Sequence, residues 1–226
     1  VNAYDYERII LEAFPDISKV LCIDSYDWKT NQPKSGKVLI VLVPVIKDRL
    51  VANVTTPSTS VKTLRKVREL IQSKISPFVQ VDVINPEYEH MRVFADVKFE
   101  KGKSAGFYLK KLNEELRAFI SPWIVDPMAE PLFQRRFPIE DIQSFIQSRK
   151  YVEFVTKVSS VKVDRRYEEG AIKEKKKPGP FTLRDTGVNP DRDNETRGRY
   201  PWSIVTTARV HQLHNMDLEK EIAPDH

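Results

Sequence analysis

The sequence predicts an α+β protein made of two small units, each with helices on one face of a mainly antiparallel sheet, and an extended C-terminal arm. Three observations support this class. Helical and strand periodicities alternate along residues 4–163, turn residues bound the short strand segments, and polar composition takes over beyond residue 163. We therefore expect a first unit at 1–85, a second at 86–163 and the arm at 164–226.

The first unit is expected to contain a helix, two strands, a helix and a strand, at 4–14, 19–27, 37–46, 61–75 and 78–84. Pro15 ends the first helix, and the hydroxyls of TPSTS (56–60) are placed to cap the second. Six consecutive apolar residues, Val38 to Val43, are typical of a strand covered on both faces. We expect that strand to form the core of the unit.

The second unit is expected to contain a strand, two helices and a closing strand over 151–163. Strict alternation from Met91 to Phe99 is the strongest strand signal in the chain. Ser104 is a plausible N-cap of the following helix, and Pro138 is placed in the first turn of the next. The apolar stripe of the first helix consists of Tyr108, Leu112, Leu116, Phe119 and Ile120. Two units of this kind are ferredoxin-like in outline.

The arm is polar between 164 and 200 and includes the basic run KEKKKPGP (173–180). Strand-like character returns in PWSIVTTARVHQL (201–213). A polar segment that ends in a strand is expected to dock on another surface, either in the same chain or in a neighbouring subunit.

Composition excludes several classes of protein. Cys22 is the single cysteine among 226 residues, which rules out an internal disulfide and a thiolate metal cluster and suits a reducing cytosol. The longest apolar run, VLIVLVPVI (38–46), is far shorter than the ~20 residues of a membrane helix. No secretory leader opens the chain, and Val1 in place of methionine suggests a piece of something longer. The net charge of +5 is spread along the chain, so it permits an acidic partner without indicating one.

Glu87, Glu89 and His90 form the most suggestive cluster of titratable residues. They resemble a general acid–base group, but alternation in a strand places the two glutamates on one face and the histidine on the other. The favoured interpretation is the polar start of a core strand.

Other candidate sites are weaker. His211 and His214 form H-x-x-H in an extended segment, where their side chains diverge, and a zinc site needs three or four ligands. The KEKKK run lacks interleaved aromatic residues, and no phosphate-binding glycine loop or G-x-S-x-G elbow occurs. We therefore predict no enzymatic activity, cofactor, bound metal or small-molecule substrate.

Aromatic residues stand at strand starts, helix ends and loop edges. Since Trp, Tyr and Arg are enriched at protein interfaces, a set of these residues is predicted to contact partners. The candidate interface residues are Trp28, Tyr88, Trp123, Arg135, Arg136, Tyr200, Trp202 and Arg209. The alternative is a nucleic-acid-binding module, but the outward face of strand 91–99 carries Asp96 beside Phe94 and makes a poor base-stacking platform.

Four segments of the chain resemble segments of one known protein family and occur in the same order. NPEYEHMRVFADVKFEKGKSAGFYLKKLNEELRAFISPW (85–123) has its N-P-x-Y-E opening, alternating strand and helix ending in Ile-Ser-Pro-Trp. The others are YDYERIILEAFPDISKVLCI (4–23), RKYVEFVTKV (149–158) and RYPWSIVTTARVHQL (199–213). The chain is similar to baseplate J-like proteins of extracellular contractile injection systems of the antifeeding-prophage type. One departure is FQRRFP (133–138), where that family tends to carry Gly-Gly.

The resemblance implies structural work. Such proteins form the wedges of a baseplate around a central spike hub, and this chain would be the C-terminal portion of one. The implied partners are a second J-like paralogue, a lysozyme-like sheath initiator and the spike or hub proteins, with neither membrane insertion nor a nucleic-acid partner. Synthesis in the bacterial cytoplasm would precede incorporation into the particle, and wedge rearrangement would trigger sheath contraction. The arm at 164–213 is expected to lie against a neighbouring subunit.

Overall fold

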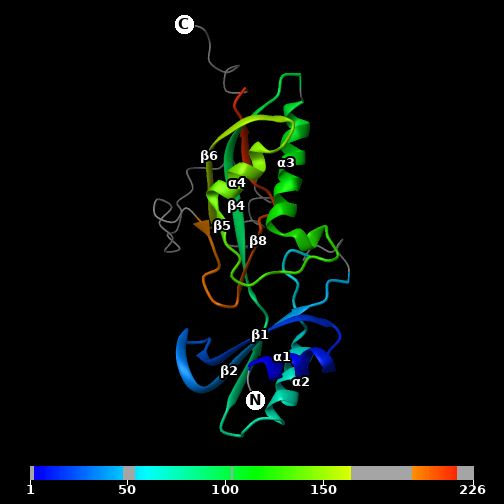
Figure 1. Ribbon diagram of the computed structural model, residues 1–226, viewed down its shortest axis with the longest axis vertical. Helices are drawn as coiled ribbons and strands as arrows, with labels where there is room; N and C mark the ends of the chain where they lie inside the picture. The colour runs from blue at the N-terminus through cyan, green and yellow to red at the C-terminus, as the bar shows by residue number, and fades with distance from the viewer. Residues whose placement is uncertain (1–2, 48–53, 103, 164–194, 218–226) are drawn as a thin grey trace, which may run out of the picture. The chain divides into compact units, whose positions relative to one another are not determined.

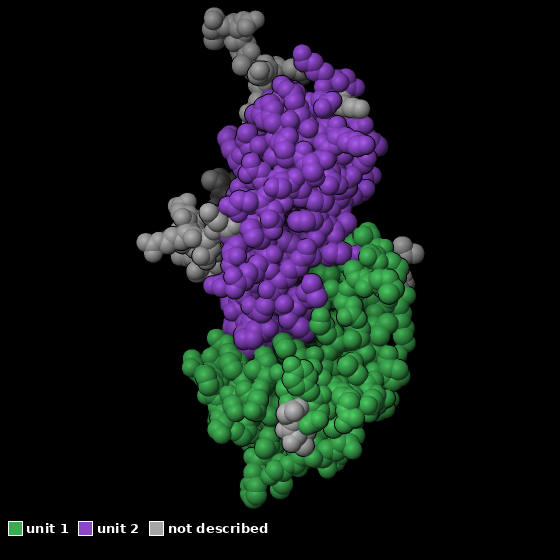
Figure 2. Space-filling view, in the orientation of Figure 1, with its two compact units in different colours: residues 1–87, 123–131 green, residues 88–122, 132–226 purple. Residues whose placement is uncertain are grey.

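The chain has the expected α+β class in this computed structural model, which describes residues 3–47, 54–102, 104–163 and 195–217. Residue contacts divide it into two compact units, coloured separately in Figure 2. Unit 1 comprises residues 1–87 and 123–131, and unit 2 comprises residues 88–122 and 132–226. Each unit has its own hydrophobic core.

The described part of unit 1 contains α1 (Ala3–Ala13), β1 (Ile17–Asp27), β2 (Gln32–Pro44), α2 (Val61–Gln72) and β3 (Gln80–Ile84), as Figure 1 shows. The strands lie in the order β1-β2-β3. β1 pairs with β2 in antiparallel fashion, whereas β2 and β3 are parallel. The sheet is therefore mixed, because the chain passes from β2 to β3 through the crossover helix α2, and such crossovers join parallel strands.

The core of unit 1 is built on β2. All six residues from Val38 to Val43 are at most 3% exposed, which confirms the prediction of a fully covered strand. Ile10 of α1 and Ile71 of α2 pack against the same face of β2 as Ile40 and Leu42. Each such aliphatic side chain stabilises the fold by about 1.5–3 kcal/mol through burial.

The start of α2 agrees with the sequence analysis. Ser60 is its N-cap, and the Ser60 hydroxyl accepts a hydrogen bond of 3.2 Å from the backbone N–H of Thr63. The helix ends at Gln72, three residues earlier than the predicted 75. Ser73 follows the last helical residue, and its hydroxyl donates to the carbonyl of Leu70 at 2.7 Å. Such local side-chain bonds compete with continuation of a helix.

The other described elements are β4 (Glu87–Phe99), α3 (Ala105–Ile120), the 3-10 turn η1 (Pro122–Ile124), β5 (Phe137–Pro138), α4 (Ile139–Gln147), β6 (Val152–Val163), β7 (Glu195–Thr196), β8 (Ser203–Thr207) and β9 (Gln212–Asn215). β4 is the central strand of the main sheet of unit 2, between β8 and β6, and it is antiparallel to β6. β9 also pairs with β4, in parallel fashion, and β5 and β7 form a separate antiparallel pair.

Residues 195–217 thus complete the sheet of unit 2. All five residues of β8 are buried, and β9 pairs with β4 from Phe94 to Val97. This part of the arm therefore docks on the same chain, which is one of the two surfaces expected for it, because the chain's own central strand offers the pairing edge. The basic run KEKKK lies at 173–177, outside the described residues.

The alternation predicted for β4 is confirmed. Its odd-numbered side chains from Met91 to Phe99 are at most 3% exposed and face α3 and α4. From α3 the buried residues are Leu112, Leu116 and Ile120, and from α4 they are Ile142 and Ile146. Both helices therefore cover one face of this sheet. Ser104 occupies the N-cap of α3 without a side-chain capping bond, and Pro138 is the N-cap of α4, one position before the predicted first turn.

Candidate interaction surfaces

Glu89 and His90, at the start of β4, hold the C-terminal segment in place. Glu89 forms an ion pair of 2.5 Å with Lys162 of β6 and accepts a 2.5 Å hydrogen bond from the backbone N–H of Arg199. His90 is buried, with Nδ1 3.2 Å from the carbonyl oxygen of Thr207. Both residues therefore have structural partners, which agrees with the favoured interpretation of a polar strand start.

His211 is the centre of a buried polar network. Its Nδ1 accepts a 3.1 Å hydrogen bond from the backbone N–H of Val93, and its Nε2 lies 3.2 Å from the hydroxyl oxygen of Thr207. Its own backbone N–H donates to the side-chain oxygen of Asn113 at 2.8 Å. Burial, with smaller contributions from Arg117 and Arg92, lowers the pKa of His211 to about 3. The imidazole is therefore neutral at pH 7 and accepts a bond that protonation would break.

His214 is exposed, so the H-x-x-H motif does not bring its two imidazoles into one site. Within the described residues, no cluster of three or more His, Cys, Asp and Glu side chains is arranged to hold a metal ion. Burial, together with Glu7 and Asp24, raises the pKa of Cys22 to about 12, so its thiol stays protonated at neutral pH. Protonation makes this cysteine a poor nucleophile.

Trp123 and Trp202 are buried. The indole N–H of Trp123 donates to the carbonyl oxygen of Val54 at 3.1 Å. Trp202 stacks on Tyr200, with ring centroids 4.8 Å apart and planes within 4° of parallel. At most 4% of either residue is exposed, so these tryptophans stabilise the fold by packing and offer almost no surface for direct contact with a partner.

Trp28 and Tyr88 are half-buried. The Nε1 atom of Trp28 is buried and has no hydrogen-bond partner among the described residues. Burial raises the pKa of the Tyr88 hydroxyl well above its usual range. Neither side chain is fully exposed in the described chain.

The three candidate arginines have different environments. The Arg135 guanidinium lies 4.6 Å from the ring centroid of Phe137, and burial lowers its pKa. Arg136 is exposed and lies 3.7 Å from the Glu195 carboxylate, which links the loop before β5 to β7. Arg209 is exposed.

Gln134 explains the departure from Gly-Gly in the loop before β5. Its φ of 55° lies in the left-handed region that glycine adopts most readily. Its side-chain amide donates to the carbonyl oxygen of Tyr200, and its backbone N–H donates to that of Ser203 at 3.3 Å. These bonds hold the loop against the segment that leads into β8.

Large exposed apolar side chains were missed by the sequence analysis. Phe78 is 89% exposed in the turn before β3, and Met128 is 88% exposed in the proline-bearing connection after η1. Phe107, at the start of α3, is also exposed and packs edge-on against Tyr108. The available signal was position, because a large apolar residue beside proline in a turn has no strand or helix face to bury it.

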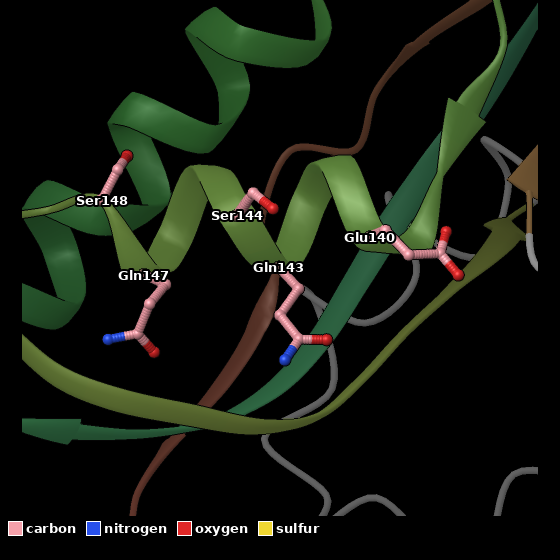
Figure 3. Close-up of a pocket in the computed structure, with 5 residues that line it drawn as sticks. All are labelled: Glu140, Gln143, Ser144, Gln147 and Ser148. Atoms are coloured by element: carbon pink, nitrogen blue, oxygen red, sulfur yellow. The ribbon is translucent and has the colours of Figure 1, made fainter.

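The hollows of the described surface are shallow. One hollow, with a volume of about 450 Å³, lies along α4 (Figure 3). Its lining consists of Glu140, Gln143, Ser144, Gln147 and Ser148. These polar side chains come from successive turns of one helix, an arrangement typical of a solvated helix face rather than a catalytic cleft. No helix in the described ranges is both long and apolar enough to cross a membrane.

Comparison with known proteins assigns the family. The family model described as "Baseplate protein PVC11-like" matches residues 9–176. Among solved structures, a chain of "Cryo-EM structure of the anti-feeding prophage (AFP) baseplate, 6-fold symmetrised" has a similar fold, with a TM-score of 0.57 and 13% identity. The similarity covers 91% of this chain and 37% of that one. No curated protein matches. The resemblance to baseplate proteins is confirmed, and the chain belongs to the family of PVC11-like baseplate proteins.

Proposed function

We propose that the chain is a structural wedge subunit in the baseplate of a contractile, phage-tail-like injection particle. It acts in baseplate assembly and in transmitting the trigger for sheath contraction. The observation that carries this proposal is the baseplate family match across residues 9–176, supported by the fold shared with a chain of the anti-feeding prophage baseplate. This chain spans 37% of that chain's length.

The protein works through contacts and not through catalysis. In the described chain, Glu89, His90 and His211, which first suggested chemistry, are engaged in structural bonds. Glu89 pairs with Lys162, and His211 accepts from Val93. Catalytic acids and bases instead need access to a substrate.

The proposed partners are a second J-like paralogue, a lysozyme-like sheath initiator and the spike or hub proteins. Exposed apolar side chains support a contact role, since a partner that covers Phe78, Met128 or Phe107 would remove apolar surface from water. Of the predicted interface set, Arg136 and Arg209 are exposed and suited to direct contact, while Trp123 and Trp202 hold the underlying surface. The protein would be made in the bacterial cytoplasm and then become part of the particle.

Deletion of the gene tests the proposal. Particles from the deletion strain, imaged by negative-stain electron microscopy, are expected to lack an ordered baseplate and an assembled sheath. Expression of the full-length gene from a plasmid should restore both. Intact, contractile particles in the deletion strain would refute the wedge role.

A further inference from the structure

Helix α2 carries a basic face. Val67 and Ile71 are fully buried, and the opposite side of the helix is exposed. The exposed cations of the first two turns are Lys62, Arg65, Lys66 and Arg68. Glu69 is the single acidic residue of the helix.

These cations lie at the unfavourable end of the helix. The N-terminus of a helix has the positive end of its macrodipole and favours carboxylates, whereas α2 has no acidic residue in its first turn and begins with Lys62. Glutamate at these positions would serve α2 better as an isolated helix. A loss of helix stability that local structure does not require is typical of residues kept for a function.

No described part of the chain neutralises this face. No carboxylate of the described residues lies within 4.0 Å of the charged nitrogens of Lys62, Arg65, Lys66 and Arg68. Other cations of the same fold are paired: Lys37 lies 2.7 Å from Asp27, and Lys98 lies 2.9 Å from Glu153. Lys62, Arg65, Lys66 and Arg68 thus form a cluster of four such cations within one stretch of α2, residues 62–68.

We propose that this face of α2 docks on a carboxylate-rich surface of a neighbouring protein in the particle, an inference that rests on the proposed baseplate function. Complementary charge steers such an encounter and fixes its register. Apolar side chains flank the face at both ends. Val61 is exposed at the start of α2, and Phe78 is exposed beside its end, where the Gln72 side chain bonds to the carbonyl of Val79 at 3.0 Å.

The same features favour a protein over a nucleic acid. Apolar anchors beside a charged strip fit a folded partner with its own apolar rim. A single-stranded nucleic acid would instead require stacking platforms, and α2 has no aromatic side chain on which a base could stack.

The test uses two variants with the same change in charge. K62E/R65E/K66E reverses the α2 face, and the control K101E/K110E/K150E reverses three exposed lysines of unit 2. Each is expressed as the full-length protein in the deletion strain, and its amount per particle is measured by mass spectrometry relative to the sheath. The α2 variant is expected to be incorporated about tenfold less than the control, because like charges across an interface oppose association.

A stability measurement separates docking from folding. The thermal midpoint of the α2 variant should equal or exceed that of the wild type, since glutamate suits a helix N-terminus. A photo-crosslinking amino acid in place of Val61, in intact particles, should capture a peptide with an excess of Asp and Glu.

Three outcomes would overturn the inference. The first is equal incorporation of both variants, and the second is capture of a peptide without an excess of Asp and Glu. The third is normal incorporation of the α2 variant together with loss of a salt-sensitive binding to a 30-base-pair DNA duplex or to phosphatidylglycerol vesicles, where the wild type and the control variant still bind. Failure here is distinct from failure of the wedge role. If gene deletion abolishes the baseplate while the α2 variant assembles normally, only the docking surface is wrong.

Discussion

Replacement of His211 by asparagine tests whether a buried, neutral imidazole holds the C-terminal strands on β4. The asparagine oxygen can accept the bond from the Val93 backbone N–H that His211 Nδ1 accepts now at 3.1 Å. It cannot take up a proton between pH 7 and 5. H211N therefore removes the titratable imidazole and keeps a hydrogen-bond acceptor for the Val93 N–H.

The magnitude follows from linkage between protonation and folding. The folded-state pKa of His211 is about 3, below the unfolded value of about 6.5. Between these values the unfolded state binds more protons, so stability is fully present above pH 6.5 and falls as the pH drops toward 3. At about 1.4 kcal/mol per pH unit, lowering the pH from 7 to 5 costs the wild type about 2 kcal/mol through His211 alone.

The assay must report on unit 2 separately. Trp202 is the one tryptophan in unit 2, since Trp28 and Trp123 belong to unit 1. Labelling with 5-fluorotryptophan gives each of the three its own ¹⁹F NMR signal. Urea titrations at pH 7 and pH 5 then follow unfolding through Trp202 in the full chain.

The control is H214N, since His214 is exposed in the same segment. H214N should show the same pH dependence as the wild type, whereas H211N should lose about 2 kcal/mol less between pH 7 and 5. H211N is expected to be less stable than the wild type at pH 7, because the bond to Thr207 is altered. Identical pH dependence in H211N and the wild type would refute the reasoning.

Two further predictions concern steric fit and a buried ion pair. A Cβ at Gly198 would lie 2.7 Å from Cβ of Ser203, so G198A should destabilise unit 2 by about 1–3 kcal/mol in urea titrations, whereas G106A, with no atom within 4 Å, should stabilise α3 by about 0.5–1 kcal/mol. K37M removes the cation 2.7 Å from Asp27, whose pKa Lys37 holds below its ordinary value, so the Asp27 pKa measured by NMR should rise. The stability lost in K37M should be present above about pH 3.9 and vanish as the pH falls through the folded-state pKa, and an unchanged Asp27 titration would contradict this account.

Local patterns predicted the core strands well. The apolar run from Val38 to Val43 and the alternation from Met91 to Phe99 both identified buried strands, because burial on two faces or one leaves a direct trace in the residue order. The direction of strand pairing was harder to predict from the sequence. Nothing in the composition of β3 reveals that it runs parallel to β2, since that depends on the path of α2.

Pairing between strands far apart in the chain could not be predicted from the sequence either. Residues 195–217 complete the sheet on β4, more than 100 positions away in sequence, through contacts such as Val93 N–H to His211. The strand-like character of 201–213 was visible, but its partner was not. An edge strand that pairs with another subunit and one that pairs with the same chain look alike in sequence.

Residue type alone does not indicate which side chains are exposed in this protein. Tryptophan enrichment at interfaces drew attention to Trp123 and Trp202, yet at most 4% of either residue is exposed. Lys62, Arg65 and Lys66 are exposed on α2. They lie at the positive end of the α2 macrodipole, and no carboxylate of the described chain pairs with them. We therefore consider them better candidates for contact with a partner, because cations at this position do not stabilise the helix. A partner that neutralises them would account for their presence.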